Sequence, residues 1–225
     1  MWRVFLVTDV GNFGGERTSL FDRIAADIRD CGYSVQPNAL PSDTISDLRN
    51  TLLGFPPEAL KPAGVGRAER HVSNSAIRRD AISWIEEPTG AQGKWLEFSA
   101  QLQQHLNRSL MLGLFSFESH YARYSPGAFY KTHVDAFKGQ ANRVLSVVLY
   151  LNEQWGQDDG GEMVLYSNAQ TSEPLFMVRP EAGTLAVFLS EEFPHEVLAA
   201  KRDRYSIAGW YRVNTTRSGR VDPPA

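Results

Sequence analysis

Cysteine is nearly absent from this chain of 225 residues, which has a single one, Cys31. One cysteine excludes an internal disulfide framework and fits a protein that works in a reducing compartment. Long apolar runs are missing too. The run VFLV near the start is too short for the core of a secretory signal, and no segment approaches the roughly 20 apolar residues that span a bilayer. These absences predict a cytoplasmic protein without a membrane partner.

An excess of basic residues is also lacking. Lysine and arginine number 23 against 26 aspartates and glutamates, which gives a formal net charge of -3. Proteins that bind nucleic acids present basic patches to the phosphates, so we expect no nucleic-acid partner. The rest of the composition, 42% hydrophobic and 22% charged, is typical of a globular chain with its own core. We expect residues 1–225 to form one domain.

The first half of the chain has apolar residues at helical spacing. This spacing predicts helices over three segments: 18–31, 44–53 and 93–107. Gly32 follows the first of them and is expected to end it. A short strand is predicted at 33–35, and the segment 54–69, rich in proline and glycine, is predicted to be a loop. Residues 16–110 are therefore expected to be mostly helical support with one long loop.

After residue 111 the apolar residues alternate, which is the pattern of strands. Turn signals such as SPG and DDGG divide this part into eight predicted strands: 114–124, 129–135, 143–151, 162–167, 175–178, 184–189, 195–199 and 204–213. Short strands without helices between them favour an antiparallel sandwich or barrel. Residues 111–213 are therefore expected to form a β core, with the helices packed outside it. The tail 214–225 is expected to be disordered.

The segment YKTHVDAF contains a histidine and an aspartate two positions apart, within a predicted strand. His133 and Asp135 would then point to the same face, because alternate residues of a strand do so. The pattern alone is weak, since five histidines in a chain with 26 acidic residues give such a pair with about even odds. His195, in FPHEV, offers a third ligand. Two histidines and one carboxylate suit a ferrous ion that keeps positions open for other ligands.

Arg204 follows His195 by nine residues and shares a predicted strand face with Ser206. A guanidinium beside a hydroxyl is a good receptor for the distal carboxylate of a small co-substrate. Structural interpretations stay open at this point. The histidine and aspartate of YKTHVDAF are compatible with a surface strand edge and His195 with a core histidine, while Arg204 has Asp203 and Glu196 as possible partners. The histidines at 71, 105 and 120 are interpreted as structural.

Four segments in a fixed order carry a resemblance to a known family. They are AIRRDAISWIEE, ARYSPGAFYKTHVDAF, SVVLYLNEQWGQDDGGEMVLY and FPHEVLAAKRDRYSIAGWY. With them the chain resembles the Fe(II)- and 2-oxoglutarate-dependent dioxygenases, as a bacterial-type member of the prolyl 4-hydroxylase group near the oxygen-sensing prolyl hydroxylases of animals. The resemblance runs from about Leu20 to Val213, and residues 1–15 have no counterpart. It implies a double-stranded β-helix core, of the jelly-roll or cupin type, with the N-terminal helices outside.

The resemblance also implies roles for matching positions. It implies three iron ligands: His133, Asp135 and His195. It assigns the C5 carboxylate of 2-oxoglutarate to Arg204 and adds three co-substrate residues: Tyr150, Tyr124 and Trp210. It implies three substrate-contacting residues: Arg78, Asp80 and Arg143, with Asp80 and Arg143 expected to pair. Two positions depart from the group. Arg79 stands where glycine is usual, which leaves the accepted peptide open, and Ser206, which we also place in the co-substrate site, stands where the nearest animal relatives often have alanine.

The activity implied by the resemblance is hydroxylation of a prolyl residue in an exposed segment of a partner protein. The reaction consumes O₂ and 2-oxoglutarate and releases succinate and CO₂, and ascorbate is a candidate stimulant. The carboxylate of Asp135 favours hydroxylation over halogenation. The loop 54–80 is expected to close over the substrate. The implied substrate to try first is elongation factor Tu. Two alternatives are the same chemistry on a free amino acid or other small molecule, and a non-catalytic metal-binding β-barrel module.

Overall fold

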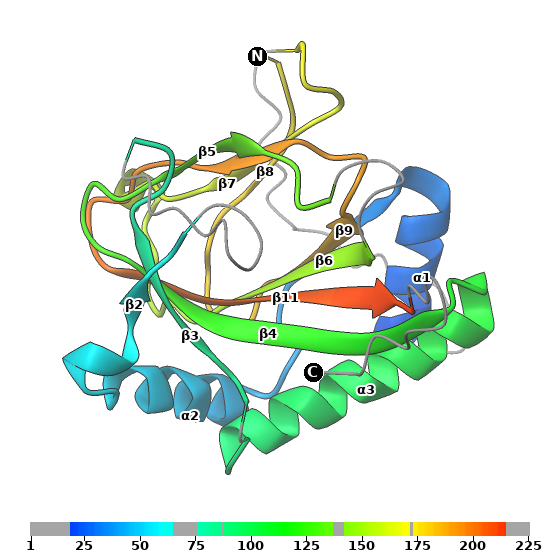
Figure 1. Ribbon diagram of the computed structural model, residues 1–225, viewed down its shortest axis with the longest axis horizontal. Coiled ribbons are helices and arrows are strands. Elements are labelled where there is room, and N and C mark those ends of the chain that lie inside the picture. The colour runs from blue at the N-terminus through cyan, green and yellow to red at the C-terminus, as the bar shows by residue number, and fades with distance from the viewer. Residues whose placement is uncertain (1–18, 65–75, 87, 137–141, 172, 215–225) are drawn as a thin grey trace.

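The computed structural model describes residues 19–64, 76–86, 88–136, 142–171 and 173–214 (Figure 1). The expectations for residues 1–15, for the tail from residue 215 and for the middle of the long loop, which contains His71, lie outside the described residues. Among the helices of the described part, none has the length and apolarity to cross a membrane.

Two antiparallel sheets face each other. The major sheet has the strand order β1-β9-β6-β11-β4-β3-β2, and the minor sheet has the order β5-β10-β7-β8. The strands of the major sheet are β1 (Tyr33–Gln36), β2 (Lys61–Pro62), β3 (Asp80–Trp84), β4 (Leu114–Tyr124), β6 (Arg143–Tyr150), β9 (Leu185–Leu189) and β11 (Arg204–Val213). Those of the minor sheet are β5 (Tyr130–His133), β7 (Met163–Tyr166), β8 (Pro174–Val178) and β10 (His195–Val197). Figure 1 shows the minor sheet above the major one.

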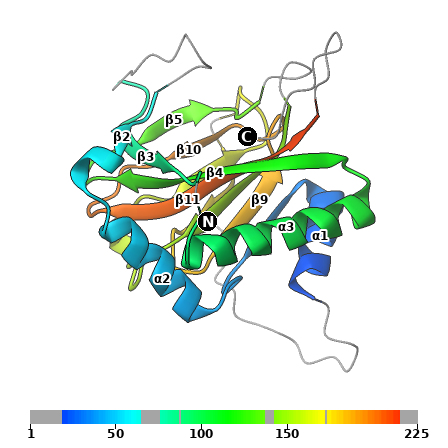
Figure 2. The ribbon, with the colours of Figure 1, turned by 60° about the horizontal axis from the view of Figure 1, so that its bottom comes forward.

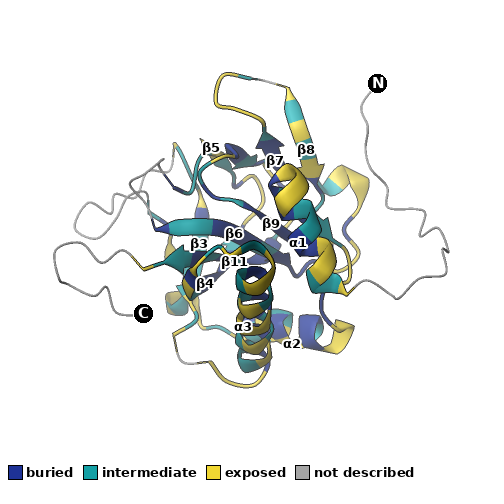
Figure 3. Ribbon diagram, turned by 90° about the vertical axis from the view of Figure 1, so that its right-hand side faces the viewer, coloured by how far each residue is buried: buried dark blue, intermediate teal, exposed yellow. Residues whose placement is uncertain are grey.

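Three helices cover the outer face of the major sheet, as Figure 2 shows: α1 (Leu20–Cys31), α2 (Ser42–Leu53) and α3 (Ala91–Leu110). Ser19 begins α1 with a reciprocal capping box to Asp22, and Gly32 ends it at a left-handed φ of 81°, which glycine adopts without a steric penalty. The helices turn their apolar sides to the sheet and their exposed residues to solvent (Figure 3). An apolar core fills the space between these helices and the major sheet. In it the hydroxyl of Tyr211 on β11 donates to the carbonyl oxygen of Ser99 on α3 at 2.8 Å.

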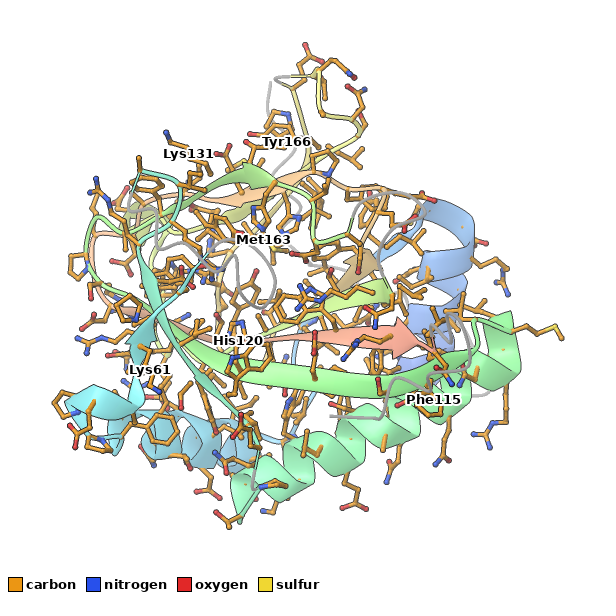
Figure 4. All side chains as sticks on the ribbon, viewed as in Figure 1. Lys61, Phe115, His120, Lys131, Met163 and Tyr166 are labelled. Carbon is orange, nitrogen blue, oxygen red and sulfur yellow. The ribbon has the colours of Figure 1, made fainter. Side chains whose placement is uncertain are left out.

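A second apolar cluster fills part of the space between the two sheets. Tyr150 and Phe188 from the major sheet pack there against Met163 and Leu165 of β7, and Figure 4 shows Met163 beneath the minor sheet. Because Tyr150 lies on this inner face, residues in register with it do too. Ser206 faces Tyr150 across the β6–β11 pair, so alternate residues of β11 from Arg204 to Trp210 line the inner face.

The eight strands predicted after residue 111 correspond to β4–β11, with ends that differ by at most two residues, and the mainly β class with helices outside is confirmed. The predicted helices and the strand at 33–35 are also present. Two strands were not predicted. β2 lies within the predicted loop 54–69, and β3 pairs with β4 along one side of the major sheet. β2 has only two residues, one of them Pro62, and β3 begins at Asp80, and both residue types are uncommon in strands.

Candidate active site

Three candidate metal ligands come together where β5 pairs with β10. His195 lies directly opposite His133 in the register of the two strands. One ligand atom from each of His133, Asp135 and His195 lies within 4.8 Å of those of the other two. Nε2 of His133 is 3.6 Å from Oδ1 of Asp135, and Nε2 of His195 is 3.6 Å from Oδ2. The structure therefore gathers the three residues that the sequence singled out.

Backbone carbonyls orient both imidazole rings. Nδ1 of His133 is 2.8 Å from the carbonyl oxygen of Lys131, and Nδ1 of His195 is 3.0 Å from that of Phe193. A carbonyl only accepts, so each Nδ1 carries the hydrogen and each Nε2 presents a lone pair. Both lone pairs belong to the nitrogens that face Asp135. This is the tautomer and orientation that a metal ligand needs.

Asp135 does not stand on a strand, and here the sequence argument was wrong. β5 ends at His133, and Asp135 lies in a bend two residues later. Its carboxylate is positioned from another strand, because the hydroxyl of Ser146 on β6 donates to Oδ2 at 2.6 Å. The carboxylate of Asp135 therefore meets the two histidines because of tertiary packing, and not because alternate residues of one strand point to the same face.

The protonation states suit a divalent cation. Burial alone would raise the pKa of Asp135, but the nearby His195 and His133 and the hydrogen bond from Ser146 outweigh it and hold that pKa well below its usual range. Burial and then the nearby His133 lower the pKa of His195 to about 4, against the opposing effects of Asp135 and of the hydrogen bond to Phe193. At neutral pH the site thus has a charged carboxylate and a neutral His195, which are the forms that bind metals.

Arg204 is fully buried on the inner face of the major sheet, at 2% exposure. Its Nε donates to the carbonyl oxygen of Gly161 at 2.8 Å, and its guanidinium carbon lies 4.9 Å and 5.1 Å from the ring centres of Tyr124 and Tyr150. Its Nη1 is 3.4 Å from the hydroxyl of Ser206. Four of the predicted co-substrate residues therefore lie side by side: Arg204, Ser206, Tyr124 and Tyr150.

No carboxylate of the described residues pairs with this buried guanidinium. Asp203 instead accepts two hydrogen bonds from Arg123, and Glu196 accepts one from Tyr166. The structural interpretation of Arg204 as a partner of Asp203 or Glu196 was therefore wrong. A buried cation such as Arg204 is stable only beside an anion. The buried hydroxyl of Tyr150 also lacks a hydrogen-bond partner among the described residues. Both groups fit the terminal carboxylate of a small co-substrate.

The inner face also carries the predicted substrate-contacting residues, with Asp80 in register with Tyr124, in pairs that differ from the expected one. Arg78 pairs with Asp80 at 2.5 Å, and Arg143 pairs with Glu118 at 2.7 Å. The expected pair of Asp80 with Arg143 is therefore not formed. The guanidinium of Arg143 lies 3.6 Å from the ring centre of Trp210, so this tryptophan is stacked at the end of the row that begins at Arg204.

Several residues of this region escaped the reading of the sequence. Tyr130 stacks on His133 with ring centres 3.5 Å apart, and its ring also lies 4.3 Å from the guanidinium carbon of Arg78. His120, interpreted as structural, is buried on the inner face against the indoles of Trp84 and Trp210, and Figure 4 labels it beside β3, β4 and β11. Ser146 had a signal in the sequence, because it is the polar residue inside the apolar run of β6.

Comparisons with known proteins agree with this arrangement. A family model described as the 2OG-Fe(II) oxygenase superfamily matches residues 119–212. A hypoxia-inducible factor prolyl hydroxylase of Caenorhabditis elegans is 34% identical over 93 residues, which are 40% of this chain. The chain spans only 12% of the length of that curated relative.

Two solved structures are similar over most of the chain. A prolyl-4-hydroxylase of Pseudomonas putida is 39% identical with a TM-score of 0.78, and the match covers 86% of this chain and 100% of that one. A prolyl hydroxylase of Trichoplax adhaerens, in complex with a peptide fragment of the hypoxia inducible factor oxygen degradation domain, is 28% identical with a TM-score of 0.75. That match covers 86% of this chain and 89% of the other. The likeness confirms the double-stranded β-helix core.

Proposed function

Because the chain belongs to the 2OG-Fe(II) oxygenases of the prolyl hydroxylase type, we propose that it hydroxylates a prolyl residue in an exposed segment of a partner protein. Elongation factor Tu is the first substrate to test. The observation that carries the oxygenase part of the proposal is the buried guanidinium of Arg204, which has no carboxylate partner among the described residues and lies on the face of the major sheet that is turned to the minor sheet with His133 and His195.

In this proposal His133, Asp135 and His195 hold Fe(II), since two neutral imidazoles and a carboxylate are the donor set that suits it. Bound iron, 2-oxoglutarate and O₂ supply the oxidation, in which 2-oxoglutarate becomes succinate and CO₂ and one oxygen atom enters a C–H bond of the substrate. Arg204 binds the C5 carboxylate with Ser206 and Tyr150, and Tyr124 and Trp210 line the space between that end and the metal ligands.

The protein's own contribution is charge, orientation and exclusion of water. Arg204 neutralises a carboxylate in a buried place, where an ionic hydrogen bond is stronger than in water. The rings of Tyr124 and Tyr150, which flank the guanidinium at 4.9 Å and 5.1 Å, keep that end of the co-substrate dry. Asp135 stays charged and His195 stays neutral at working pH, so neither residue has to lose a proton before the metal binds.

A prolyl substrate is supported by the aromatic residues beside the site. Trp84 is 44% exposed, and its ring centre lies 6.3 Å from that of Trp210. An exposed indole next to a buried site offers an apolar wall to a compact, apolar ring such as the pyrrolidine of proline. Arg143, which lies on the ring of Trp210, and Arg78, which lies over the ring of Tyr130 and is held by Asp80, are the proposed contacts of the peptide backbone. The peptide bound by the Trichoplax relative supports a polypeptide substrate.

The oxygenase site is tested without oxygen. Anaerobic addition of Fe(II) and 2-oxoglutarate should give the visible charge-transfer band of the chelate, and His133→Ala or Asp135→Ala should abolish it. His105→Ala is the matched control, because His105 lies on α3 and pairs with Asp22 at 3.1 Å. A band that survives both site variants would contradict the ligand assignment.

The substrate is tested by mass spectrometry. Purified elongation factor Tu, incubated with enzyme, Fe(II), 2-oxoglutarate and O₂, should gain one oxygen atom on a proline, while free proline should not. Oxidation of free proline alone would favour the small-molecule alternative. Omission of ascorbate tests its role as a stimulant. We also propose a cytoplasmic location, in keeping with the single cysteine, and tagged protein in cell fractions tests it.

A further inference from the structure

Two buried serines stand behind the carboxylate of Asp135. Ser146 lies in the middle of β6 and Ser190 directly after β9, and their exposures are 1% and 0%. The oxygen of Ser146 is 2.6 Å from Oδ2 of Asp135 and 2.9 Å from the hydroxyl oxygen of Ser190. The three side chains therefore form one hydrogen-bonded row that ends at a proposed metal ligand.

The direction of the hydrogen bonds follows from the charge of Asp135. An ionised carboxylate only accepts, so the hydroxyl hydrogen of Ser146 must point to Oδ2. The oxygen of Ser146 is then left as an acceptor for the hydroxyl of Ser190. Each serine has one hydrogen to donate, and in this order both hydrogens are used. The row thus runs from Ser190 through Ser146 to Asp135.

Both serines are fixed by the backbone of the major sheet. Ser146 is opposite Phe188 of β9 and opposite Trp210 of β11. The backbone N–H of Ser190 donates to the carbonyl oxygen of Val144 on β6 at 3.0 Å. Asp135, in contrast, lies in a bend beyond the last residue of β5. The rigid end of the row is therefore the pair of serines, and the carboxylate is the end that needs support.

We propose that Ser146 and Ser190 are positioning residues that hold the carboxylate of Asp135 in the orientation in which it binds the metal. The inference rests on the proposed function, because Asp135 is there assigned as an iron ligand. Groups that hydrogen-bond a metal ligand commonly change metal affinity 10- to 100-fold when they are removed. A buried pair of serines with no influence on the metal is the competing interpretation.

Mn(II) binding to the metal-free protein, followed by electron paramagnetic resonance, separates the two interpretations without any turnover. Ser146→Thr keeps the hydroxyl and Ser146→Val has the same shape without it, so overpacking by the added carbons affects both variants alike. We expect Ser146→Val to bind Mn(II) roughly 10- to 100-fold more weakly than Ser146→Thr. Ser99→Ala is the control, since Ser99 is buried on α3 and donates to the carbonyl of Trp95 at 2.9 Å. It should bind Mn(II) as the wild type does.

Ser190 provides a second and independent variant. Ser190→Ala should weaken Mn(II) binding less than Ser146→Val, because it removes only the far donor of the row. In the Ser146→Val background it should have no further effect on Mn(II), since the row is already broken there. Equal Mn(II) affinities of Ser146→Thr and Ser146→Val would overturn the inference and leave the proposed function standing. Failure of the wild type to bind Mn(II) would instead remove the metal site itself, and the inference with it.

Discussion

The guanidinium of Arg78 holds the carboxylate of Asp80 through two parallel hydrogen bonds, Nε to Oδ1 at 2.7 Å and Nη2 to Oδ2 at 2.5 Å. The side chain of Asp80 is fully buried and that of Arg78 is 13% exposed. Arg78 also donates to the carbonyl oxygen of Gly64 at 3.2 Å and lies over the ring of Tyr130. Since Tyr130 stacks on His133, one arginine connects the loop before β3 to a proposed metal ligand.

Breaking this pair should destabilise the protein strongly. Asp80→Asn keeps the size of the side chain but leaves the charge of Arg78 uncompensated, which costs about 3–5 kcal/mol for a buried pair. Urea unfolding measures the loss. Asp203→Asn is the matched control, because Arg123 binds Asp203 with the same two-pronged geometry at 3.1 Å and 3.2 Å in a more exposed place. That variant should lose under about 1 kcal/mol. Equal losses would contradict the prediction.

Sequence reasoning identified the residues of the candidate site but not all of the contacts between them. The three candidate ligands and Arg204 were found because they occur together in ordered segments that resemble a known family, whereas each pattern alone is weak. The pairing of Asp80 was wrong, because Arg78 is in the same extended segment and Arg143 is taken by Glu118.

The strands after residue 111, where turn signals separate alternating runs, were predicted, whereas β2 and β3 were missed. Nothing in the sequence indicated that Ser190 belongs to the site. It follows β9 in a polar stretch, and only the packing of β9 against β6 brings its hydroxyl to Ser146. Hydrogen-bonded rows between strands of this kind depend on register, which a single sequence does not state.

Gly161 is expected to be required for the position of Arg204. Its φ is +72°, and a β-carbon there would lie 3.1 Å from Cδ of Arg204 and 2.9 Å from Cβ of Ala200. Its carbonyl also accepts from Arg204. Gly161→Ala should therefore raise the KM for 2-oxoglutarate roughly 10-fold, a loss of about 1.4 kcal/mol. Initial rates of succinate release at varied 2-oxoglutarate measure it.

Gly113→Ala separates this steric effect from backbone strain. Gly113 has a φ of +67°, but a β-carbon there has no atom within 4 Å. Gly113→Ala should therefore lose on the order of 1 kcal/mol of unfolding free energy through its left-handed backbone alone, and Gly161→Ala should lose more because its β-carbon also meets Cβ of Ala200 at 2.9 Å. Only Gly161→Ala should change the KM for 2-oxoglutarate. A rise of the same size in Gly113→Ala would show that global strain, and not Arg204, is responsible.

Glu118 should influence the polypeptide substrate more than the co-substrate. It accepts from Arg143 at 2.7 Å and from Arg212 at 3.3 Å, and Arg143 lies on the ring of Trp210. Glu118→Gln weakens the hold on Arg143, so we expect the KM for the protein substrate to rise roughly 5-fold, about 1 kcal/mol. The KM for 2-oxoglutarate should stay unchanged. Glu181→Gln, which weakens the exposed Arg179–Glu181 pair, is the control and should change neither constant.

His120 should make the stability of the protein fall in mild acid. Its ring is 4% exposed, and burial lowers its pKa to about 4, against a weaker opposing effect of the hydrogen bond to the carbonyl of Tyr121. Asp80 raises this pKa, while Arg78 and Arg143 lower it. An unfolded histidine has a pKa of about 6.5, so below that pH the unfolded chain takes up a proton that the folded chain refuses. Stability from this residue is therefore complete above pH of about 6.5 and is lost as the pH falls toward about 4.

The size of the effect follows from the two pKa values. Between about pH 7 and about pH 5 the wild type should lose about 2 kcal/mol through His120 alone. His120→Met fills a similar volume without a titrating group, so its unfolding free energy should fall by that much less over the same interval. Urea unfolding of both proteins at the two pH values measures the difference, and every other titrating group contributes to both and cancels. Equal pH dependence would instead mean that the pKa of His120 in the folded protein is the same as in the unfolded chain, about 6.5, so that burial does not hinder its protonation.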